Sequence, residues 1–214
     1  TTANASATGT ATITDDADAT IVTLSATPSV AEGGTIVYTA TLTSAAVTPM
    51  TVSLSNGATI AIAAGATSGI SAIAAPSDDA VIDAGSVSAT ITSTSGGSLE
   101  AVAIDTSAAT TTIADTIDTT TATLTATPSV AEGGTITWTV SLTAPVTGSD
   151  VSVTLAGGQV ITIPVGASSG TATGTAPDDV FAGGASVANN IATISGGNFE
   201  ALAPKSAAEG KSVT

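Results

Sequence analysis

The sequence contains no cysteine and no histidine. Disulfides, zinc sites built from cysteine or histidine, thiol chemistry and imidazole catalysis are therefore excluded. Basic residues are nearly absent as well, since the 214 residues include 17 acids but only two bases, Lys205 and Lys211. Nucleic acids and anionic membranes bind basic patches, so neither is expected as a partner. Acids that crowd together before residue 205 must be spread out or neutralised by a bound cation.

Aromatic residues and long apolar runs are also scarce. There are four aromatic side chains, and the 43% apolar content is mostly Ala, Val, Ile and Leu. A core of such small side chains buries little area per residue, which predicts modest intrinsic stability. The apolar runs are too short to cross a bilayer, so no membrane insertion is expected. No signal peptide is visible and the chain begins at Thr1, so we expect a fragment of a longer protein.

The sequence is organised by an internal repeat. TPSVAEGGT at residues 27–35 returns unchanged at residues 127–135, an offset of one hundred residues. Likewise, ATITDDAD at residues 11–18 aligns with TTIADTID at residues 111–118. A repeat of this length is too long for a solenoid unit and matches one autonomous sandwich domain. The expected divisions are the end of an upstream repeat with its linker (1–18), a first repeat (19–118) and a second repeat (119–214).

Apolar and polar residues alternate with a period of two, which predicts β-strands. Tyr38 and Trp138 occupy the same inward position of equivalent strands and are expected in the cores. No helical pattern appears. Seven strands with frequent turns predict an all-β chain of two tandem immunoglobulin-like, Greek-key β-sandwich domains. The expected strands of the first repeat are 20–26, 36–42, 50–54, 59–63, 69–75, 86–94 and 109–114.

Strand direction predicts where the acids gather. If consecutive strands run in opposite directions, the loops after the first and fifth strands and the end of the seventh lie at one pole. Two like charges about 5 Å apart repel by roughly 3 kcal/mol at an effective dielectric of about 20, so a divalent cation is expected there. Ca²⁺ suits such loops because it accepts six to eight oxygens in irregular geometry. The recurring acids predicted to bind Ca²⁺ at this pole are Glu32, Asp78, Asp79, Asp115 and Asp118.

The same alignment gives further candidate metal ligands. The second repeat is expected to form an incomplete set, because Asp83 is replaced by Gly183 and the counterparts of Asp115 and Asp118 would follow Thr214. Three acids that do not recur, Asp83, Asp105 and Asp150, are expected to be solvated. The additional candidates are Glu132, Asp178 and Asp179 in the second repeat, Asp15, Asp16 and Asp18 in the N-terminal linker, and Glu100 and Glu200, which would join Asp15–Asp18 and Asp115–Asp118 respectively.

Several segments resemble a known family. TATLTATPSVAEGGTITWTVSLT, SGGNFEA and ATTTIADTIDTTT resemble the tandem immunoglobulin-like extender repeats of giant bacterial RTX-type adhesins, which include biofilm and ice-binding adhesins. EGGT followed by a strand also resembles Calx-β domains, which bind Ca²⁺ through loop acids at one pole. The resemblance implies a Gram-negative cell surface, type I secretion, Ca²⁺-dependent folding after export and a spacer role. The segment ALAPKSAAEGKSVT departs from the first repeat and leaves open an end-of-array variant or a distinct neighbouring module.

The favoured function is therefore a structural extender, a monomer whose partners are neighbouring repeats of its own chain. Ca²⁺ at the junctions would make the array rigid and hold a distal binding region away from the cell. An alternative is an adhesion module that binds sugar, protein or ice through outward-facing threonines, although sugar sites favour exposed aromatics. Paired carboxylates could also serve a glycosidase, but acids in loops without a cleft predict that the chain is not an enzyme.

Overall fold

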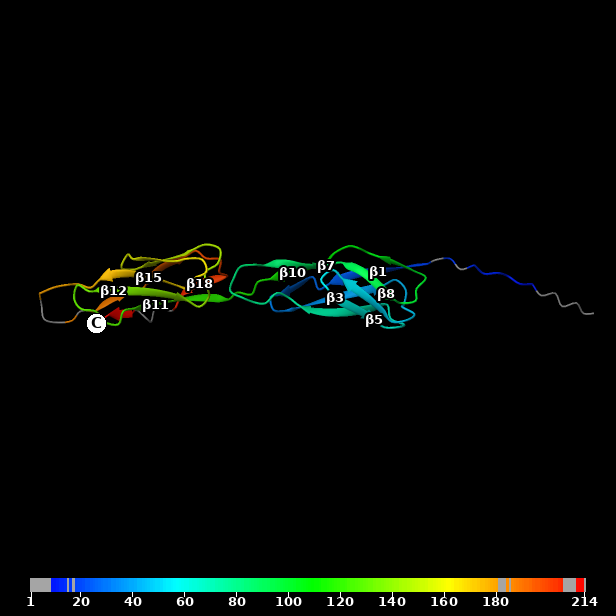
Figure 1. Ribbon diagram of the computed structural model, residues 1–214, viewed down its shortest axis with the longest axis horizontal. Coiled ribbons are helices and arrows are strands. Elements are labelled where there is room, and N and C mark those ends of the chain that lie inside the picture. Colours follow the sequence, from blue (N-terminus) through cyan, green and yellow to red (C-terminus); the bar gives the residue numbers. More distant parts are fainter. Residues whose placement is uncertain are drawn as a thin grey trace, which may run out of the picture. The chain divides into compact units, whose positions relative to one another are not determined.

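The computed structural model describes residues 9–14, 16, 18–180, 184, 186–205 and 211–213. All regular secondary structure in this part of the chain is β-strand, which confirms the predicted fold class (Figure 1). Across these residues, no helix is long and apolar enough to span a membrane. The chain forms two compact units. The first comprises Thr1–Val30, Gly34–Ala75 and Ser86–Ile113, and the second comprises Ala31–Gly33, Pro76–Gly85 and Ala114–Thr214.

The strands of the first repeat form three sheets. Two of these, with strand orders β6-β3-β1-β9 and β5-β4-β8, supply most of its core residues, and the third has the order β2-β10-β7. β1 pairs antiparallel with β3 and parallel with β9. The strands are β1 (Ala19–Ala26), β2 (Ser29–Ala31), β3 (Thr35–Leu42), β4 (Met50–Leu54), β5 (Thr59–Ile62), β6 (Ser68–Ala74), β7 (Gly85–Ala89), β8 (Ile91–Gly96), β9 (Ala101–Ile104) and β10 (Ala109–Ala114).

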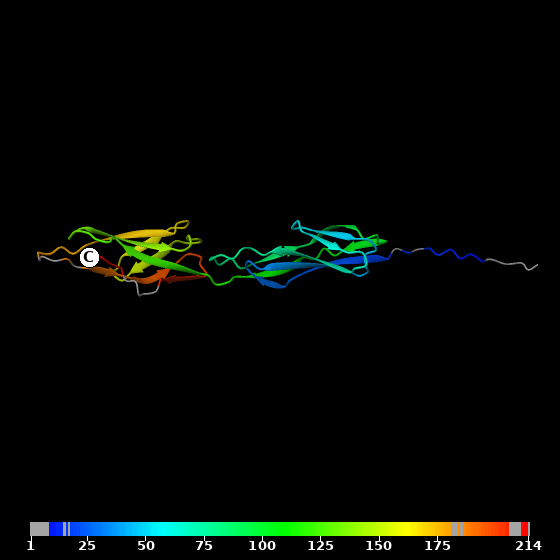
Figure 2. The same cartoon turned by 90° about the horizontal axis from the view of Figure 1, so that it is seen from below.

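The second repeat has the same central pairings. Its strands are drawn in green to red in Figure 2. Its sheets have the orders β15-β12-β11-β18, β14-β13-β17 and β16-β19. Thr119 pairs with Ala201 in parallel, as Ala19 does with Ala101, so the register repeats with the hundred-residue offset of the sequence. The strands are β11 (Thr119–Ala126), β12 (Thr135–Leu142), β13 (Val151–Leu155), β14 (Val160–Ile163), β15 (Ser169–Thr175), β16 (Val187–Asn189), β17 (Ile191–Ser195), β18 (Ala201–Pro204) and β19 (Lys211–Val213).

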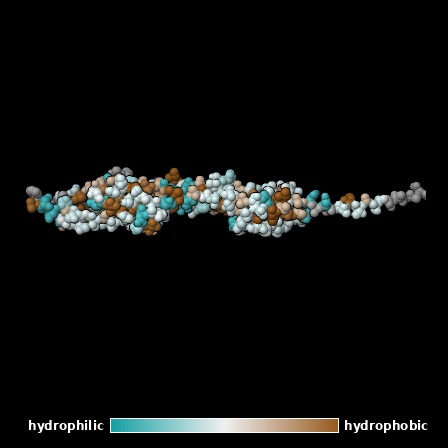
Figure 3. All heavy atoms as spheres, turned by 90° about the horizontal axis from the view of Figure 1, so that it is seen from above, coloured by the Kyte–Doolittle hydropathy of each residue, from teal (hydrophilic) through white to brown (hydrophobic). Residues whose placement is uncertain are grey.

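Each repeat has its own core, built from the inward residues of alternating strands. Tyr38 and Trp138 are 0% and 1% exposed, which confirms them as core residues. β3 and β12 alternate buried and more exposed positions along their whole length, as the period of two predicts. On the face drawn in Figure 3, hydrophobic atoms are interspersed with polar ones. Exposed apolar side chains such as Ile70 and Val160 belong to different repeats.

The predicted single strand over residues 86–94 is wrong. It is two strands, β7 and β8, which join different sheets. Ala89 and Ile91 are both buried on either side of Thr90, so the alternating pattern continues through the point where the chain changes sheets. The alternating pattern also does not predict the short strands β2 and β9, so the expected number of seven strands per repeat is too low. The predicted domain boundaries at residues 18 and 118 stay a prediction.

Candidate metal centre

Glu32 lies in the turn between β2 and β3, and this turn belongs to the second compact unit. Its backbone N–H donates to the Ala114 carbonyl (3.1 Å), and the Gly33 N–H donates to the Pro76 carbonyl (2.6 Å). Gly33 has φ +67°, a conformation that favours glycine, and a Cβ there would lie 3.8 Å from the Cβ of Asp78. These contacts hold the turn in place, and the Glu32 side chain is only 7% exposed.

The segment Pro76–Gly85 belongs to the same unit and pairs with the loop that precedes β18. Val81 forms an isolated antiparallel bridge with Phe199, and the Glu200 N–H donates to the Ala80 carbonyl (3.3 Å). Phe199 is 7% exposed and packs with the core of the second repeat. Two contacts therefore hold the backbone of Glu200 against this segment: the bridge at the preceding residue, Phe199, and the hydrogen bond of the Glu200 N–H itself.

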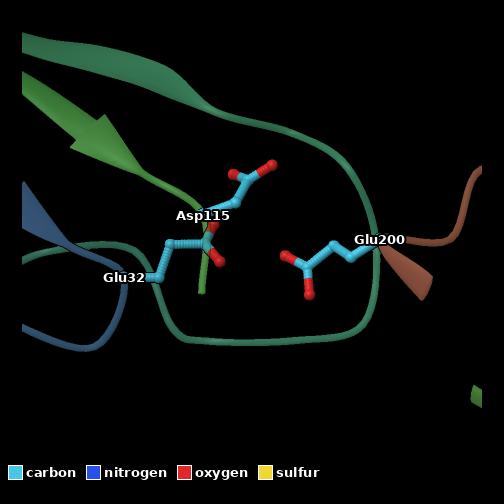
Figure 4. A group of neighbouring side chains, drawn as sticks. All are labelled: Glu32, Asp115 and Glu200. Carbon is cyan, nitrogen blue, oxygen red and sulfur yellow. The ribbon is translucent and has the colours of Figure 1, made fainter. Parts of the chain in front are cut away.

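The carboxyl groups of Glu32, Asp115 and Glu200 form a cluster, and each offers one oxygen that lies within 4.8 Å of the others. In each residue one carboxyl oxygen is buried and has no hydrogen-bond partner among the described residues: Glu32 Oε2, Asp115 Oδ1 and Glu200 Oε1. The other oxygen of Glu200, Oε2, accepts from the Asp118 N–H (2.6 Å). Figure 4 shows the Glu32 and Glu200 carboxyl groups directed toward each other inside a curved loop.

Three buried oxygens without donors would be costly if they served no purpose, because an unsatisfied buried polar atom costs about 1–3 kcal/mol, and more when charged. No Lys or Arg precedes Lys205 in the sequence, so the cluster has no nearby basic residue in the chain segments that build it. The donor set consists of carboxylate oxygens, which suit a hard cation. The residues present therefore fit a metal ion, and the acidic cluster can hold one.

The pKa of Glu32 is raised from its ordinary value of 4.5 to about 7. The main cause is a hydrogen bond with the Asp83 carboxyl group, which requires a proton on one of the two groups. Burial raises the pKa further, as do the negative charges of Asp83, Asp115 and Asp79. Near neutral pH, Glu32 therefore either keeps a proton or needs a cation.

This shift predicts how the metal-free protein responds to pH. A carboxyl group whose pKa is higher in the folded state stabilises the fold below its unfolded pKa, and this contribution is lost as the pH rises through the folded value. In chelator, the melting temperature is therefore expected to fall between pH 5 and pH 7.5, the range that spans the rise of the Glu32 pKa to about 7. The variant Glu32→Gln cannot titrate and should flatten this dependence, whereas Glu132→Gln should keep it. Equal pH slopes in the wild type and Glu32→Gln would contradict the assignment.

The non-recurring acids behave differently from one another. Asp83 is exposed, as expected of a solvated acid, although its carboxyl group lies close enough to Glu32 to raise the pKa of that residue. The Ser107 side chain and the Ser107 N–H (2.9 Å) both hydrogen-bond to Asp105, and these two bonds lower its pKa. Asp150 is exposed, and its Oδ1 accepts from the Val165 N–H (2.9 Å). Asp150 is thus solvated as expected, whereas Asp105 is only partly exposed.

Three other predicted ligands surround the cluster without joining it. Asp78 accepts a hydrogen bond from the Thr116 hydroxyl, and Asp79 accepts from the Val81 N–H (2.7 Å). Asp118 contributes its backbone N–H to Glu200. All three acidic side chains are exposed. Their role as metal ligands stays a prediction.

Among the described residues, the remaining predicted ligands are not brought into the cluster either. Asp15 lies outside the described residues. The Asp18 N–H donates to Glu100 Oε2 (2.9 Å), which repeats the contact between Asp118 and Glu200. The side chains that the structure leaves exposed are Asp16, Asp18, Glu100, Glu132, Asp178 and Asp179.

Comparison with known proteins identifies the family. The LapA domain family matches residues 18–116 and 118–214. LapA is a large biofilm adhesin of Pseudomonas, and the family is in general non-enzymatic. Among curated proteins, none matches the chain. Membership of this family indicates a surface adhesin-related repeat at a cell-surface or extracellular location. With both of its repeats matched, the chain belongs to the LapA domain family.

Proposed function

We propose that the two repeats are structural extenders of a bacterial surface adhesin and that Ca²⁺ bound by Glu32, Asp115 and Glu200 stiffens the array. The observation that carries this proposal is the set of three buried carboxyl oxygens without hydrogen-bond partners, one from each residue. Their negative charges raise the free energy of the metal-free fold, and a divalent cation would neutralise them.

Ca²⁺ is favoured over other cations by the ligand chemistry. The sequence offers no cysteine or histidine, so the soft and nitrogen-ligated metals lack their usual partners. The three carboxyl groups come from a turn, the end of a strand and a loop, and such a set suits the irregular coordination of Ca²⁺ better than the octahedral demand of Mg²⁺. Extracellular modules bind Ca²⁺ with dissociation constants of about 0.1–1 mM.

The residues at the cluster would have different roles. In sequence, Glu32 and Asp115 come from the first family match and Glu200 comes from the second, so one cation held by all three would link segments of both. The Asp118 N–H orients the Glu200 carboxylate by occupying Oε2, which leaves Oε1 for the cation. A bound cation would displace the proton that the raised pKa of Glu32 favours near neutral pH. The extender would then project a distal binding region from the cell.

The proposal also covers how the protein is exported and where it folds. Gram-negative type I secretion and Ca²⁺-dependent folding after export are supported by the resemblance to RTX-type extender repeats. The acidic composition supports the absence of nucleic-acid partners, and the short apolar runs support the absence of membrane insertion. Low cytosolic Ca²⁺ would leave the chain less stable before export than after it.

Calorimetric titration with CaCl₂ tests the proposal. The wild type should bind Ca²⁺ near neutral pH, and Glu32→Gln should weaken that binding about tenfold or more, which corresponds to about 1.4 kcal/mol. Glu132→Gln is a matched control, because Glu132 stands at the equivalent position of the same motif but is exposed. Equal binding by both variants would show that the buried cluster is not the site.

A further inference from the structure

We propose that Asn198 is a positioning residue for the cation site, and that it acts by holding Ile82 and the segment Pro76–Gly85 against the loop of Glu200. The inference rests on the proposed function for the cation itself. The contacts that carry it are made by backbone groups and one side-chain amide, so they do not depend on whether a cation is bound.

Asn198 engages both backbone polar groups of Ile82. The Ile82 N–H donates to the Asn198 carbonyl (3.2 Å), and Asn198 Nδ2 donates to the Ile82 carbonyl (2.9 Å). The bridge between Val81 and Phe199 lies directly beside these two bonds, and the hydrogen bond of the Glu200 N–H follows it. The Asn198 side chain therefore adds a bond of its own to a short backbone pairing.

The segment Pro76–Gly85 is attached to both of the loops that carry cluster residues. Near its start, the Pro76 carbonyl accepts an N–H of the Glu32 turn (2.6 Å). Farther along, Asn198 holds it beside Glu200. A segment fixed at both of these points helps to set the separation of the two carboxyl groups, which offer oxygens within 4.8 Å of each other. Asn198 thus acts on the cluster through the segment.

The bond from the Asn198 side chain is expected to affect cation affinity more than folding stability. Ile82 lies at the surface and is 53% exposed, so water can replace the Asn198 amide at the Ile82 carbonyl at little cost. The segment would then be freer to move. A site whose loops are already held in place loses less conformational freedom on binding, and it therefore binds its ligand more tightly.

The surroundings of Asn198 suit an asparagine. A Cβ at Gly148 would lie only 2.9 Å from the Asn198 Cβ, so the glycine leaves room for this side chain. The Ile82 carbonyl needs a donor, which the asparagine amide supplies. An ionised carboxylate of the same shape has no donor, and a leucine has neither donor nor acceptor.

Calorimetric titration of Asn198→Leu with CaCl₂ tests the positioning role. Leucine keeps the branched shape of the side chain but not its donor, so Ca²⁺ binding should weaken about three- to tenfold, as the loss of one hydrogen bond implies. Asn56→Leu is the matched control, because Asn56 Oδ1 accepts from the Ala58 N–H (3.1 Å) in a turn of the first repeat. The control should bind Ca²⁺ as the wild type does. In EDTA, Asn198→Leu should lower the melting temperature no more than Asn56→Leu does.

Hydrogen exchange followed by NMR in EDTA tests the contact without a cation. The Ile82 amide should exchange about three- to tenfold faster in Asn198→Leu than in the wild type, because the segment is held less firmly. The Ala167 amide serves as an internal reference, since it donates to the Pro164 carbonyl (3.0 Å) within a turn of the second repeat. Its exchange should be equal in both proteins.

The outcomes separate this inference from the proposed function. If Asn198→Leu binds Ca²⁺ as tightly as the wild type while Glu32→Gln weakens binding, the positioning role is overturned and the extender proposal stands. Equal exchange of the Ile82 amide in both proteins would also overturn the positioning role. Absence of Ca²⁺ binding to the wild type would overturn the proposed function, and with it the role of Asn198 at a cation site.

Discussion

Removal of Ca²⁺ is expected to lower the melting temperature of the second unit by about 10–20 °C. A ligand at a hundredfold excess over its dissociation constant stabilises the folded state by roughly 2.7 kcal/mol. In a domain of this size, each 1 kcal/mol shifts the melting temperature by about 4–8 °C. The effect is large because the cation offsets the repulsion of three clustered carboxylates, and because a core of small side chains has little stability in reserve. Differential scanning calorimetry in CaCl₂ and in EDTA measures it.

The variant Glu32→Gln provides the control for this effect. It removes one buried charge, so the EDTA-treated variant should be at least as stable as the EDTA-treated wild type near pH 7.5. It also removes a ligand, so most of the response to CaCl₂ should disappear. Melting curves of the wild type that coincide in the two solutions would refute the stabilising role of the cluster.

Gly196→Ala is expected to destabilise the second repeat strongly. Gly196 has φ +95°, and a Cβ there would overlap the carbonyl oxygen of Asp150 and lie 3.2 Å from the Cα of Val151. Both contacts are with backbone, which cannot move aside as a flexible side chain can. Strain at positive φ costs about 1–3 kcal/mol, and overpacking adds about 1–3 kcal/mol. The loop would shift and displace Glu200, so Ca²⁺ affinity should fall as well.

The variant Gly158→Ala separates the effect of backbone strain from the effect of steric overlap. Gly158 has φ +84°, but a Cβ there would meet no atom within 4 Å. This variant should therefore show the backbone strain alone and should keep the wild-type Ca²⁺ affinity. Urea unfolding and calorimetric titration of both variants measure the difference. If the two variants were equally destabilised, the steric conflict at Gly196 would not be the reason for the glycine.

Much of the candidate site follows from two properties of the sequence. The hundred-residue offset identifies equivalent positions, and alternating strand direction places the turn of Glu32 and the end of β10 at one pole. Glu200 follows from the same alignment, because its loop lies next to the linker of Asp115 and Asp118. These are arguments from periodicity and chain direction, which the backbone of a β-sandwich obeys closely.

The rest could not be predicted because it depends on what packs against each residue. Asp83 does not recur in the second repeat, yet its carboxyl group raises the pKa of Glu32, because a residue beside a site that occurs once need not be repeated in the sequence. Recurrence equally included Glu132, which is exposed although its motif is identical to that of Glu32. The Glu32 side chain is buried by segments distant in sequence, which hydrogen-bond to its turn at Pro76 and Ala114. A local motif does not contain these segments. The change of sheet at Thr90 could not be predicted either, because the alternation of apolar and polar residues that marks a strand continues through it.

A crystal structure of the chain grown in CaCl₂, with anomalous scattering data, tests the central claim most directly. An anomalous peak is expected about 2.3–2.6 Å from carboxylate oxygens of Glu32, Asp115 and Glu200. Density that fits only water at this position, with the three carboxyl groups turned apart at saturating Ca²⁺, would contradict it.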